Sequence, residues 1–321
     1  MDDPHKSVTK EPAERLRQGV LSFSSGGKLQ TRPPSTPKTR DGDELVRVAR
    51  ETVSVLPGLL HTRPDAKPDG YLYEKDAATP LDQSFCPKLP KTKIRVISSD
   101  TIDAALQLSS SSGGGGPSQK PVCVLNMANA IHAGGGFKHG SLAQEEALCF
   151  RTSLIFTLKL RLYPIPDKAA IYSPTVLVIR DSLANGHQLL DSRDPEKLPV
   201  ISVVSAAAVF RPTLGNNAAQ PNQDANEFYA RREDREMMRD KMRVILRTAI
   251  KNRHRKIVLG AFGCGAFHNP PKEVARLWSE VLQEAEFAGG WWEDVVFAVL
   301  ALGSSDKNFQ WFSEELDGVL V

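Results

Sequence analysis

The sequence predicts an α/β protein in which a largely parallel sheet lies between two layers of helices. Short apolar runs rich in β-branched residues alternate along the chain with longer segments of helical periodicity. Several of these runs are apolar throughout, as in strands buried on both faces. Glycine-rich segments follow two of them, at the strand ends where such sheets bind ligands. The length of 321 residues, with 40% apolar and 25% charged residues, suits one large globular domain or two small ones.

The composition also bounds the class of protein. The net charge of +3, from 41 basic and 38 acidic residues, argues against attraction of the whole surface to nucleic acid. We therefore expect no direct sequence-specific binding of nucleic acid. The four cysteines lack paired spacing and predict reduced thiols: Cys86, Cys123, Cys149 and Cys264. Without an apolar signal segment or an apolar run near 18 residues, we expect no secretion, no membrane span and an intracellular location, in the nucleus or cytoplasm.

The N-terminal part is predicted in three segments. Residues 1–42 are polar and rich in proline, serine, threonine and lysine, which predicts a mostly disordered tail. Residues 44–60 have helical periodicity, and Pro57 and Gly58 are expected to end that helix. Residues 61–92 are irregular. The expected inward face of the helix consists of Leu45, Val48, Thr52 and Val55.

Residues 93–161 contain the stretch around which the rest is organised. A strand over 93–98 and a helix over 100–108 are followed by a low-complexity surface loop. The apolar run at 122–125 predicts a buried strand, and Gly134, Gly135 and Gly136 come after it. Ser141 and Gln144 have the spacing of a capping box, which predicts a helix running to about residue 161 with Glu145 and Glu146 in its first turns. A strand, a glycine loop and a helix start form an anion site, because unpaired N–H groups point at one place.

The C-terminal half continues the alternation. Strands are expected at 176–179, 198–206, 256–261 and 294–302, and a mobile loop at 211–224. A charged helix is expected at 225–252, with Met238, Met242, Ile245 and Ala249 inward. A second glycine loop follows the strand at 256–261, and Asn269 can cap a helix whose first residues are Pro270 and Pro271. Both glycine loops follow strands, so they can converge on one ligand.

Three motifs carry a family resemblance: GGG at 134–136, QEE at 144–146 and GCGAFHN at 263–269, in this order. They resemble the signature of the poly(ADP-ribose) glycohydrolases, and most closely the microbial type, which is built on a macrodomain. The resemblance implies a macrodomain-type catalytic domain at 93–321, with an accessory segment at 43–92 that packs on it. It also implies hydrolysis of the ribose–ribose O-glycosidic bonds of poly(ADP-ribose), in exo mode and without a cofactor or a metal.

The same resemblance implies the partners. They are poly(ADP-ribose) or ADP-ribosylated proteins, with ADP-ribose as product, and a setting of ADP-ribosylation in the DNA damage response. A monomer that does not bind membranes is expected. Two alternatives stay open: removal of single ADP-ribose groups from proteins, and a non-catalytic macrodomain that only binds ADP-ribose. Intact Glu145 and Glu146 argue against the second alternative.

By resemblance, Glu146 is the general acid that protonates the departing ribose oxygen, and its carboxylate then activates water. Glu145 positions the ribose hydroxyls, since adjacent helical residues diverge by about 100° and cannot share one task. Asn129, together with Asn126, is a candidate for the distal ribose; the alternative is a pair of turn-forming residues. Gln144 completes the signature and is counted with the binding residues.

The two glycine loops are assigned to the diphosphate and the distal ribose. The assigned residues are Gly134, Gly135 and Gly136 on one side, and Gly263, Cys264, Gly265 and Ala266 on the other. Phe267 either stacks on the distal ribose or is a core aromatic, and Asn269 is a helix cap or a ligand contact. His132 and His139 show no third metal ligand and are expected at the surface. The segment 205–210 departs from the family pattern, which leaves contacts on the adenine side open.

Overall fold

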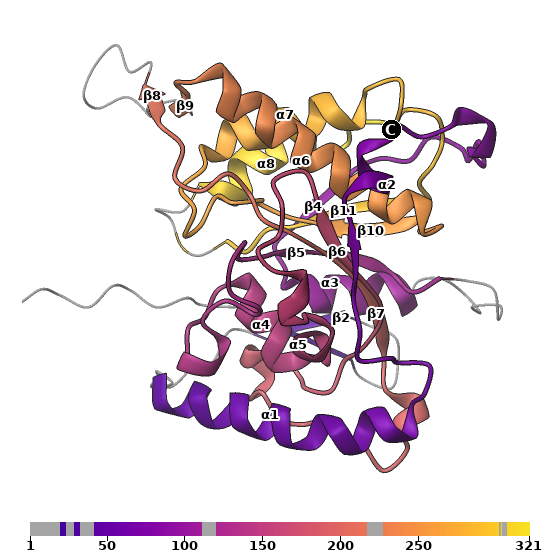
Figure 1. The fold of residues 1–321 in the computed structure, drawn as a ribbon, viewed down its shortest axis with the longest axis vertical. Helices are drawn as coiled ribbons and strands as arrows, with labels where there is room; N and C mark the ends of the chain where they lie inside the picture. Colours follow the sequence, from indigo (N-terminus) through magenta and orange to yellow (C-terminus); the bar gives the residue numbers. More distant parts are fainter. Residues whose placement is uncertain are drawn as a thin grey trace, which may run out of the picture.

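The computed structural model describes residues 20–23, 29–32, 42–110, 120–216, 227–301, 303 and 307–321. Seven strands form one sheet in the order β3-β6-β7-β5-β10-β11-β4 (Figure 1). Their bounds are β3 Tyr71–Tyr73, β4 Arg95–Ile97, β5 Cys123–Met127, β6 Ala170–Leu177, β7 Val200–Ala206, β10 Lys256–Leu259 and β11 Asp294–Ala298. The five strands from β7 to β4 are parallel, while β6 runs antiparallel to β7 and to β3. The mostly parallel sheet predicted from the sequence is confirmed.

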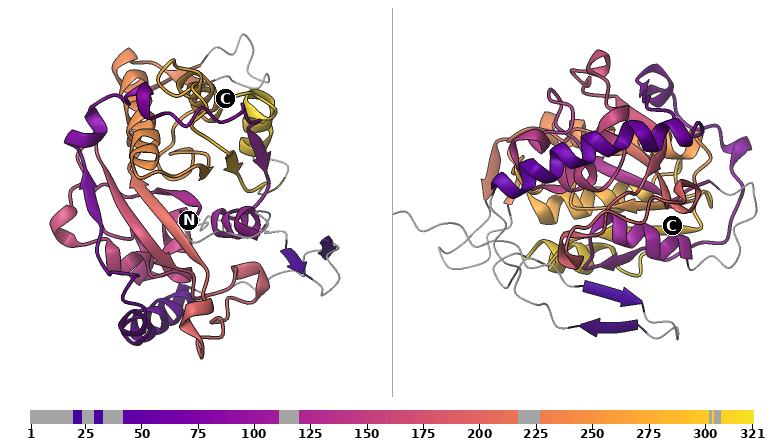
Figure 2. Two further views of the ribbon diagram at one scale, coloured as in Figure 1. Left: turned by 90° about the vertical axis from the view of Figure 1, so that its right-hand side faces the viewer. Right: turned by 90° about the horizontal axis from the view of Figure 1, so that it is seen from below.

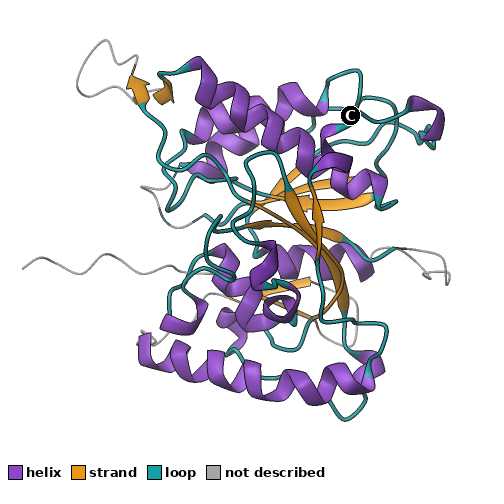
Figure 3. Ribbon diagram, viewed as in Figure 1, coloured by secondary structure: helices purple, strands orange, loops and turns teal. Residues whose placement is uncertain are grey.

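Helices cover both faces of this sheet, as Figures 1 and 3 show. One layer consists of α6 (Arg232–Lys251), α7 (Pro271–Leu282) and α8 (Asn308–Leu316), with the short α2 (Lys75–Ala78) against α6. The other contains α3 (Thr101–Ser110), α4 (Gln144–Arg151) and α5 (Leu154–Thr157), with α1 (Gly42–Thr62) packed against α4. Turned views show the same three layers (Figure 2). Within the described residues, no helix combines the length and the apolar character needed to cross a bilayer.

The hydrophobic core is divided by the sheet. Leu125, Val204 and Leu259 point to the layer of α6, α7 and α8. Val124 and Val258, from neighbouring strands, point to the layer of α3 and α4. Because both faces are covered, every position of such a strand is buried, which explains the apolar runs in the sequence. The inward residues predicted for α6 are all fully buried: Met238, Met242, Ile245 and Ala249.

Helix α1 is longer than predicted. It continues through Pro57 to Thr62, so the predicted end at Pro57 and Gly58 is wrong. Pro57 lies on the exposed side of the helix, while its neighbour Leu56 is fully buried against the core. Burial of the apolar face therefore outweighs the hydrogen bond that proline cannot donate. The buried residues are Leu45, Ala49, Thr52 and Leu56. The other two predicted inward residues, Val48 and Val55, are partly buried and pack against the core, so the predicted inward face is confirmed.

The helix after the first glycine loop also ends earlier than predicted. Thr152 has extended backbone, with φ −141° and ψ 173°, and it separates α4 from the short α5. Its hydroxyl donates to the Leu148 carbonyl (2.7 Å) and accepts from the Leu154 N–H (3.1 Å). A threonine side chain that bonds to the backbone in this way competes with helical hydrogen bonds. The prediction of one helix to residue 161 is therefore wrong.

Further differences lie near the ends of elements. The charged helix begins at Arg232 because Glu227–Tyr229 forms β9, which pairs with β8 (Leu214–Asn216). Part of the predicted mobile loop is therefore a strand, and its residues 217–224 lie outside the described residues. The predicted disordered tail also lies largely outside them, although β1 (Val20–Phe23) and β2 (Leu29–Arg32) pair within it. Strand β3, from the predicted accessory segment, joins the edge of the main sheet.

Candidate active site

The two glycine loops follow neighbouring strands, β5 and β10. These strands are parallel, so their carboxyl ends lie at one edge of the sheet, as predicted. Their pairing covers only two residues of β5, Cys123 and Val124, whereas β7 pairs with β5 as far as Met127. The strands therefore part before β5 ends, and the backbone of residues 125–127 loses a partner on the β10 side.

The Gln144 side chain takes the place of that partner. Its Oε1 accepts from the Met127 N–H (2.9 Å), and its Nε2 donates to the Leu125 carbonyl (2.7 Å). Nε2 also approaches the Thr101 hydroxyl at 3.3 Å. The structure therefore places Gln144 as a clamp between β5 and the first turn of α4, which fixes where the following two glutamates lie.

Replacing Gln144 with methionine should separate this clamp from a ligand contact. Methionine keeps the length of the side chain but leaves the Met127 N–H and the Leu125 carbonyl without their present partners. We expect the free energy of unfolding to fall by about 1–3 kcal/mol. Urea unfolding of both proteins, with ADP-ribose affinity measured in parallel, tests this. Unchanged stability with weaker ADP-ribose binding would instead favour direct contact with the ligand.

Glu146 connects the first glycine loop to the start of α4. Its Oε1 accepts from the Gly136 N–H (2.7 Å), and its Oε2 accepts from the Ala143 N–H (2.9 Å). Ala143 is the N-cap position, so the capping box predicted at Ser141 is wrong. The carboxylate performs the capping instead, because it sits at the third helical position and reaches back to the N-cap N–H. Glu146 is only 7% exposed.

The glycines of this loop permit the carboxylates to approach the backbone closely. Gly134 and Gly135 have left-handed φ values of 73° and 55°. A Cβ at Gly135 would lie 2.4 Å from Oε1 of Glu146 and 3.0 Å from Oε2 of Glu145. The Gly135 N–H donates to the His132 carbonyl (2.9 Å) and the Gly136 N–H to Glu146. These two loop N–H groups therefore form hydrogen bonds within the chain.

Glu145 is the more deeply buried member of the acid pair, at 4% exposure. Its Oε2 accepts from the Asn129 N–H (2.8 Å), and the Asn126 amide nitrogen lies 3.5 Å from its Oε1. Burial raises the pKa of Glu145 to about 8, and the charge of Glu146 adds to this, while the bond from Asn129 opposes it. At neutral pH Glu145 is therefore mainly a neutral carboxylic acid.

This ionisation predicts a pH-dependent stability. The pKa of Glu145 is raised above its ordinary value of 4.5, so its proton stabilises the folded state. That stability is fully present below pH 4.5 and is lost as the pH rises towards about 8. Relative to the Glu145→Gln variant, wild type should lose about 1.4 kcal/mol per pH unit across this interval. Chemical unfolding at several pH values tests this, with exposed Glu74→Gln as the control. A difference that does not change with pH would contradict it.

The two asparagines lie on opposite sides of Glu145. The Asn129 Oδ1 accepts from the N–H groups of Ile131 and His132, each at 2.9 Å, so this side chain stabilises the turn that follows β5. Asn126 is fully buried, and its Nδ2 donates to the Ser205 hydroxyl on β7 at 3.0 Å. Among the described residues, its Oδ1 has no hydrogen-bond partner. The sequence interpretation missed Ser205, although a serine within an apolar strand is a usable signal.

The second glycine loop is fixed by Asn269, which is 2% exposed. Its Nδ2 donates to the carbonyls of Val209 (2.7 Å) and Gly263 (3.1 Å), and its Oδ1 accepts from the Tyr229 hydroxyl (2.9 Å). The N-cap of α7 is Pro270, so the prediction that Asn269 caps this helix is wrong. Gly263 has φ 77°, and a Cβ there would lie 2.6 Å from the Asn269 amide. This asparagine therefore joins the loop to β9 and to the segment after β7.

The outer part of this loop presents hydrogen-bond donors. Gly265 and Ala266 are exposed, and Phe267 is half-buried. Among the described residues, the N–H groups of these three have no hydrogen-bond partner. By contrast, the Cys264 N–H donates to the Ala261 carbonyl (3.1 Å). Successive free N–H groups at a strand end form a concavity that attracts anions.

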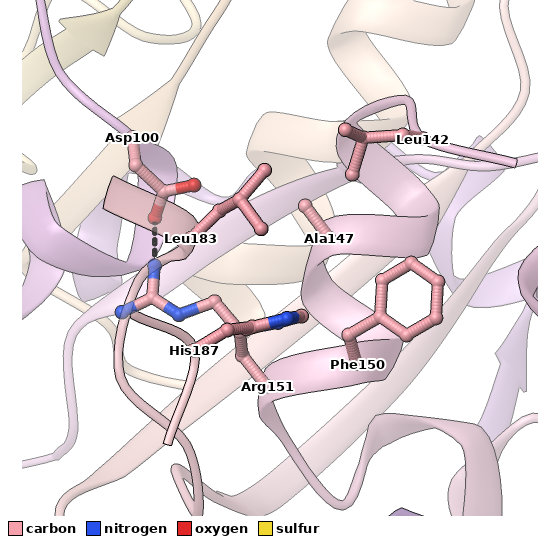
Figure 4. Close-up of a pocket in the computed structure, with 7 residues that line it drawn as sticks. All are labelled: Asp100, Leu142, Ala147, Phe150, Arg151, Leu183 and His187. Atoms are coloured by element: carbon pink, nitrogen blue, oxygen red, sulfur yellow. Dashed lines mark hydrogen bonds and ion pairs between the residues drawn. The ribbon is translucent and has the colours of Figure 1, made fainter. Parts of the chain in front are cut away.

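A pocket with a mostly apolar lining lies elsewhere on α4, apart from the acid pair (Figure 4). Asp100 accepts from the Ile102 N–H (2.8 Å), so it caps α3. It also forms an ion pair with buried Arg151. Arg151 also pairs with Asp103 at 2.6 Å. The pocket residues are Asp100, Leu142, Ala147, Phe150, Arg151, Leu183 and His187. These ion pairs anchor the end of α4 opposite to Glu145 and Glu146.

The remaining candidates for a reactive site are the metal-ligating side chains and the thiols. In the part of the chain that the structure describes, no group of three histidine, cysteine, aspartate or glutamate side chains could hold a metal ion. His132 and His139 are exposed, as expected. Burial raises the pKa of the thiols of Cys123 and Cys149, so both stay protonated.

Comparison with known proteins confirms the resemblance stated above. Residues 66–181 match the family model of the microbial-type PARG, catalytic domain. This range includes the first glycine loop and the acid pair but not the second loop. No curated protein matches the chain.

Solved structures of poly(ADP-ribose) glycohydrolases share the fold. One from Thermomonospora curvata is 25% identical, with a TM-score of 0.69, and covers 85% of this chain and 100% of its own. The same organism's enzyme bound to the inhibitor ADP-HPD is 26% identical, with a TM-score of 0.66, over 85% of this chain and 99% of its own. An enzyme from Deinococcus radiodurans in complex with ADP-ribose is 26% identical, with a TM-score of 0.60, over 81% of this chain and 97% of its own.

Proposed function

Since residues 66–181 match the microbial-type poly(ADP-ribose) glycohydrolase catalytic domain, we propose that this protein hydrolyses the ribose–ribose O-glycosidic bonds of poly(ADP-ribose) and releases ADP-ribose. The observation that carries the proposal is the acid pair, Glu145 and Glu146, held against Gly135 at the carboxyl end of β5. The similar bacterial structures, with ADP-ribose or an inhibitor bound, support the same ligand class.

Glu146 is the proposed general acid. Two backbone N–H groups, from Gly136 and Ala143, fix its carboxyl group. It gives its proton to the ribose oxygen that leaves from the anomeric carbon, and its carboxylate then takes a proton from the attacking water. One proton is given and one regained in each turnover, so the enzyme returns to its starting state.

Glu145 is the proposed positioning group for the reacting ribose. With a pKa of about 8, it is mainly uncharged at pH 7 and can donate a hydrogen bond to a ribose hydroxyl. A neutral Glu145 also reduces repulsion between the acid pair and the substrate diphosphate. Asn126 and Asn129 flank Glu145 and are the proposed partners of the same sugar.

The diphosphate is proposed to lie along the second glycine loop, where Gly265, Ala266 and Phe267 offer N–H donors. Gly263 and Cys264 set the path of this loop, and Phe267 is proposed to face the distal ribose. Gly134, Gly135 and Gly136 form the opposite wall. Gln144 and Asn269 act through the backbone that they hold in place.

The wider setting is proposed from the same resemblance. The partners are poly(ADP-ribose) or ADP-ribosylated proteins, and the protein works as an intracellular monomer in ADP-ribosylation, including the DNA damage response. The division into an accessory segment at 43–92 and a catalytic domain at 93–321 also stays a prediction.

The test is a time course with purified protein and automodified polymer. We expect free ADP-ribose as the product, accumulating from the start of the reaction as exo cleavage requires. A parallel reaction with a protein that carries single ADP-ribose groups measures the competing activity. Release from that substrate alone would favour mono-ADP-ribosyl hydrolysis, and calorimetric binding without any release would favour a binding module.

A further inference from the structure

The structure presents an exposed aromatic ring next to a cation at the edge of the proposed active site. Phe210 follows β7 and is 65% exposed. Its ring meets that of Phe267 edge to face, with centroids 5.1 Å apart and an interplanar angle of 88°. The Arg211 guanidinium lies over the Phe210 ring, 5.5 Å from its centroid. Among the described residues, Arg211 has no acidic partner.

These two residues are held in place by the second glycine loop. The Arg211 N–H donates to the Phe267 carbonyl (2.9 Å), and the Asn269 amide donates to the carbonyl of Val209 (2.7 Å). Arg211 has φ 45°, in the left-handed region that a non-glycine residue rarely adopts. A strained backbone held by such bonds is a feature of binding sites. Phe210 is therefore presented by a fixed segment, although most of its ring surface is uncovered.

The order of the strands indicates what lies near this ring. Glu145 is joined through Asn126 to Ser205, so the acid pair lies towards β7. The free N–H donors for the diphosphate lie after β10, on the other side of β5. A bound ADP-ribose unit therefore extends from the acid pair towards β10. The group on the far side of the bond to be cleaved extends towards β7, the strand that Phe210 follows. Phe210 also packs on Phe267, which is proposed to face the distal ribose, so the exposed ring lies beside the sugar whose bond is cleaved.

We propose that Phe210 and Arg211 form a subsite for the departing part of the polymer, namely the adenosine diphosphate portion of the next unit. This rests on the proposed function. The adenine stacks on the exposed surface of Phe210, and the guanidinium binds the diphosphate, which it can do through paired hydrogen bonds. A purine nucleotide supplies both the flat ring that stacks on Phe210 and the negative charge that Arg211 binds. Because the subsite binds the departing unit and not the released one, it raises the affinity for polymer and leaves the affinity for free ADP-ribose unchanged.

The experiment measures binding in the Glu146→Gln background, so that the polymer survives. Phe210→Ala should weaken polymer binding about tenfold, within the range known for base stacking on aromatic side chains, while ADP-ribose affinity changes less than about twofold. Phe210→Trp should retain polymer binding, since it keeps a flat ring. Arg211→Ala should weaken polymer binding and reduce its salt dependence. The control is Phe85→Ala, because Phe85 is 77% exposed and lies on the distant η1 (Gln83–Phe85).

The outcomes separate the subsite from the function. Equal loss of polymer and ADP-ribose binding in Phe210→Ala would overturn the subsite, because the ring would then belong to the product site. Unchanged polymer binding would overturn it as well. If the protein with Glu146 intact releases no ADP-ribose, the proposed function fails, but the ratio of the two affinities still decides the subsite.

Discussion

The Glu146→Gln variant should lose ADP-ribose release almost completely, with kcat for polymer about 1,000-fold below wild type. Glutamine has nearly the same shape but can neither give the proton to the departing oxygen nor activate water. The glutamine amide oxygen can still accept a hydrogen bond from one of the two N–H groups that bind Glu146, those of Gly136 and Ala143. The fold and the glycine loop should therefore survive, and the affinity for ADP-ribose should stay within about tenfold of wild type.

A matched control is available in the same fold. Glu273 occupies the third helical position of α7, as Glu146 does in α4, and pairs with Arg235 at 2.7 Å. Glu273→Gln should leave kcat unchanged, which would show that losing a glutamate at a helix start does not by itself remove activity. Release of ADP-ribose by Glu146→Gln at more than a tenth of the wild-type rate would refute the assignment of the acid.

Replacing Gly135 with alanine should damage both stability and activity. The left-handed φ of 55° costs a non-glycine residue about 1–2 kcal/mol. The new Cβ would also lie 2.4 Å from Oε1 of Glu146, so the carboxylate must move. Together we expect a loss of about 3 kcal/mol in the free energy of unfolding. A displaced acid should lower kcat about 100-fold, even at temperatures where the variant stays folded. Thermal unfolding and polymer digestion measure the two effects.

Gly265 provides the comparison. It is exposed, its φ is not left-handed, and a Cβ there would meet no atom within 4 Å. Gly265→Ala should therefore change the free energy of unfolding by less than about 0.5 kcal/mol. If the diphosphate lies along this loop, the methyl group should weaken ADP-ribose binding without altering stability. Equal stability losses in the two alanine variants would contradict the conformational argument for Gly135.

The neutral state of Glu145 has a consequence for catalysis as well as for stability. Ionisation of Glu145 above pH 8 would add a negative charge beside the substrate diphosphate. When the Asn126 amide rotates by half a turn, its oxygen replaces its nitrogen at the position facing Glu145, so an acceptor replaces a donor there. The Ser205 hydroxyl can donate or accept a hydrogen bond, so it can pair with either orientation of the amide. Glu145 can therefore keep a hydrogen-bond partner in both protonation states.

The sequence alone determined the kind of fold and the two segments that form the candidate site. Apolar runs such as 122–125 identify strands buried on both faces. If polar side chains alternated with apolar ones, the polar side chains would be buried on one of those faces. Once the sheet is parallel, the glycine loops that follow β5 and β10 must lie at one edge of it. The local sequence pattern is sufficient for these conclusions. Each depends only on which residues along a strand are apolar, or on the direction in which the strand runs.

Only the tertiary structure decided what each side chain near the acid pair does. The sequence gives no sign that β5 and β10 separate after Val124, so it could not show that Gln144 replaces a missing strand. Likewise, Asn269 meets Val209 and Tyr229, which are 60 and 40 residues away in the chain. Hydrogen bonds over such separations depend on how elements pack, and no local pattern encodes them. The raised pKa of Glu145 has the same origin, because burial is a property of the folded protein.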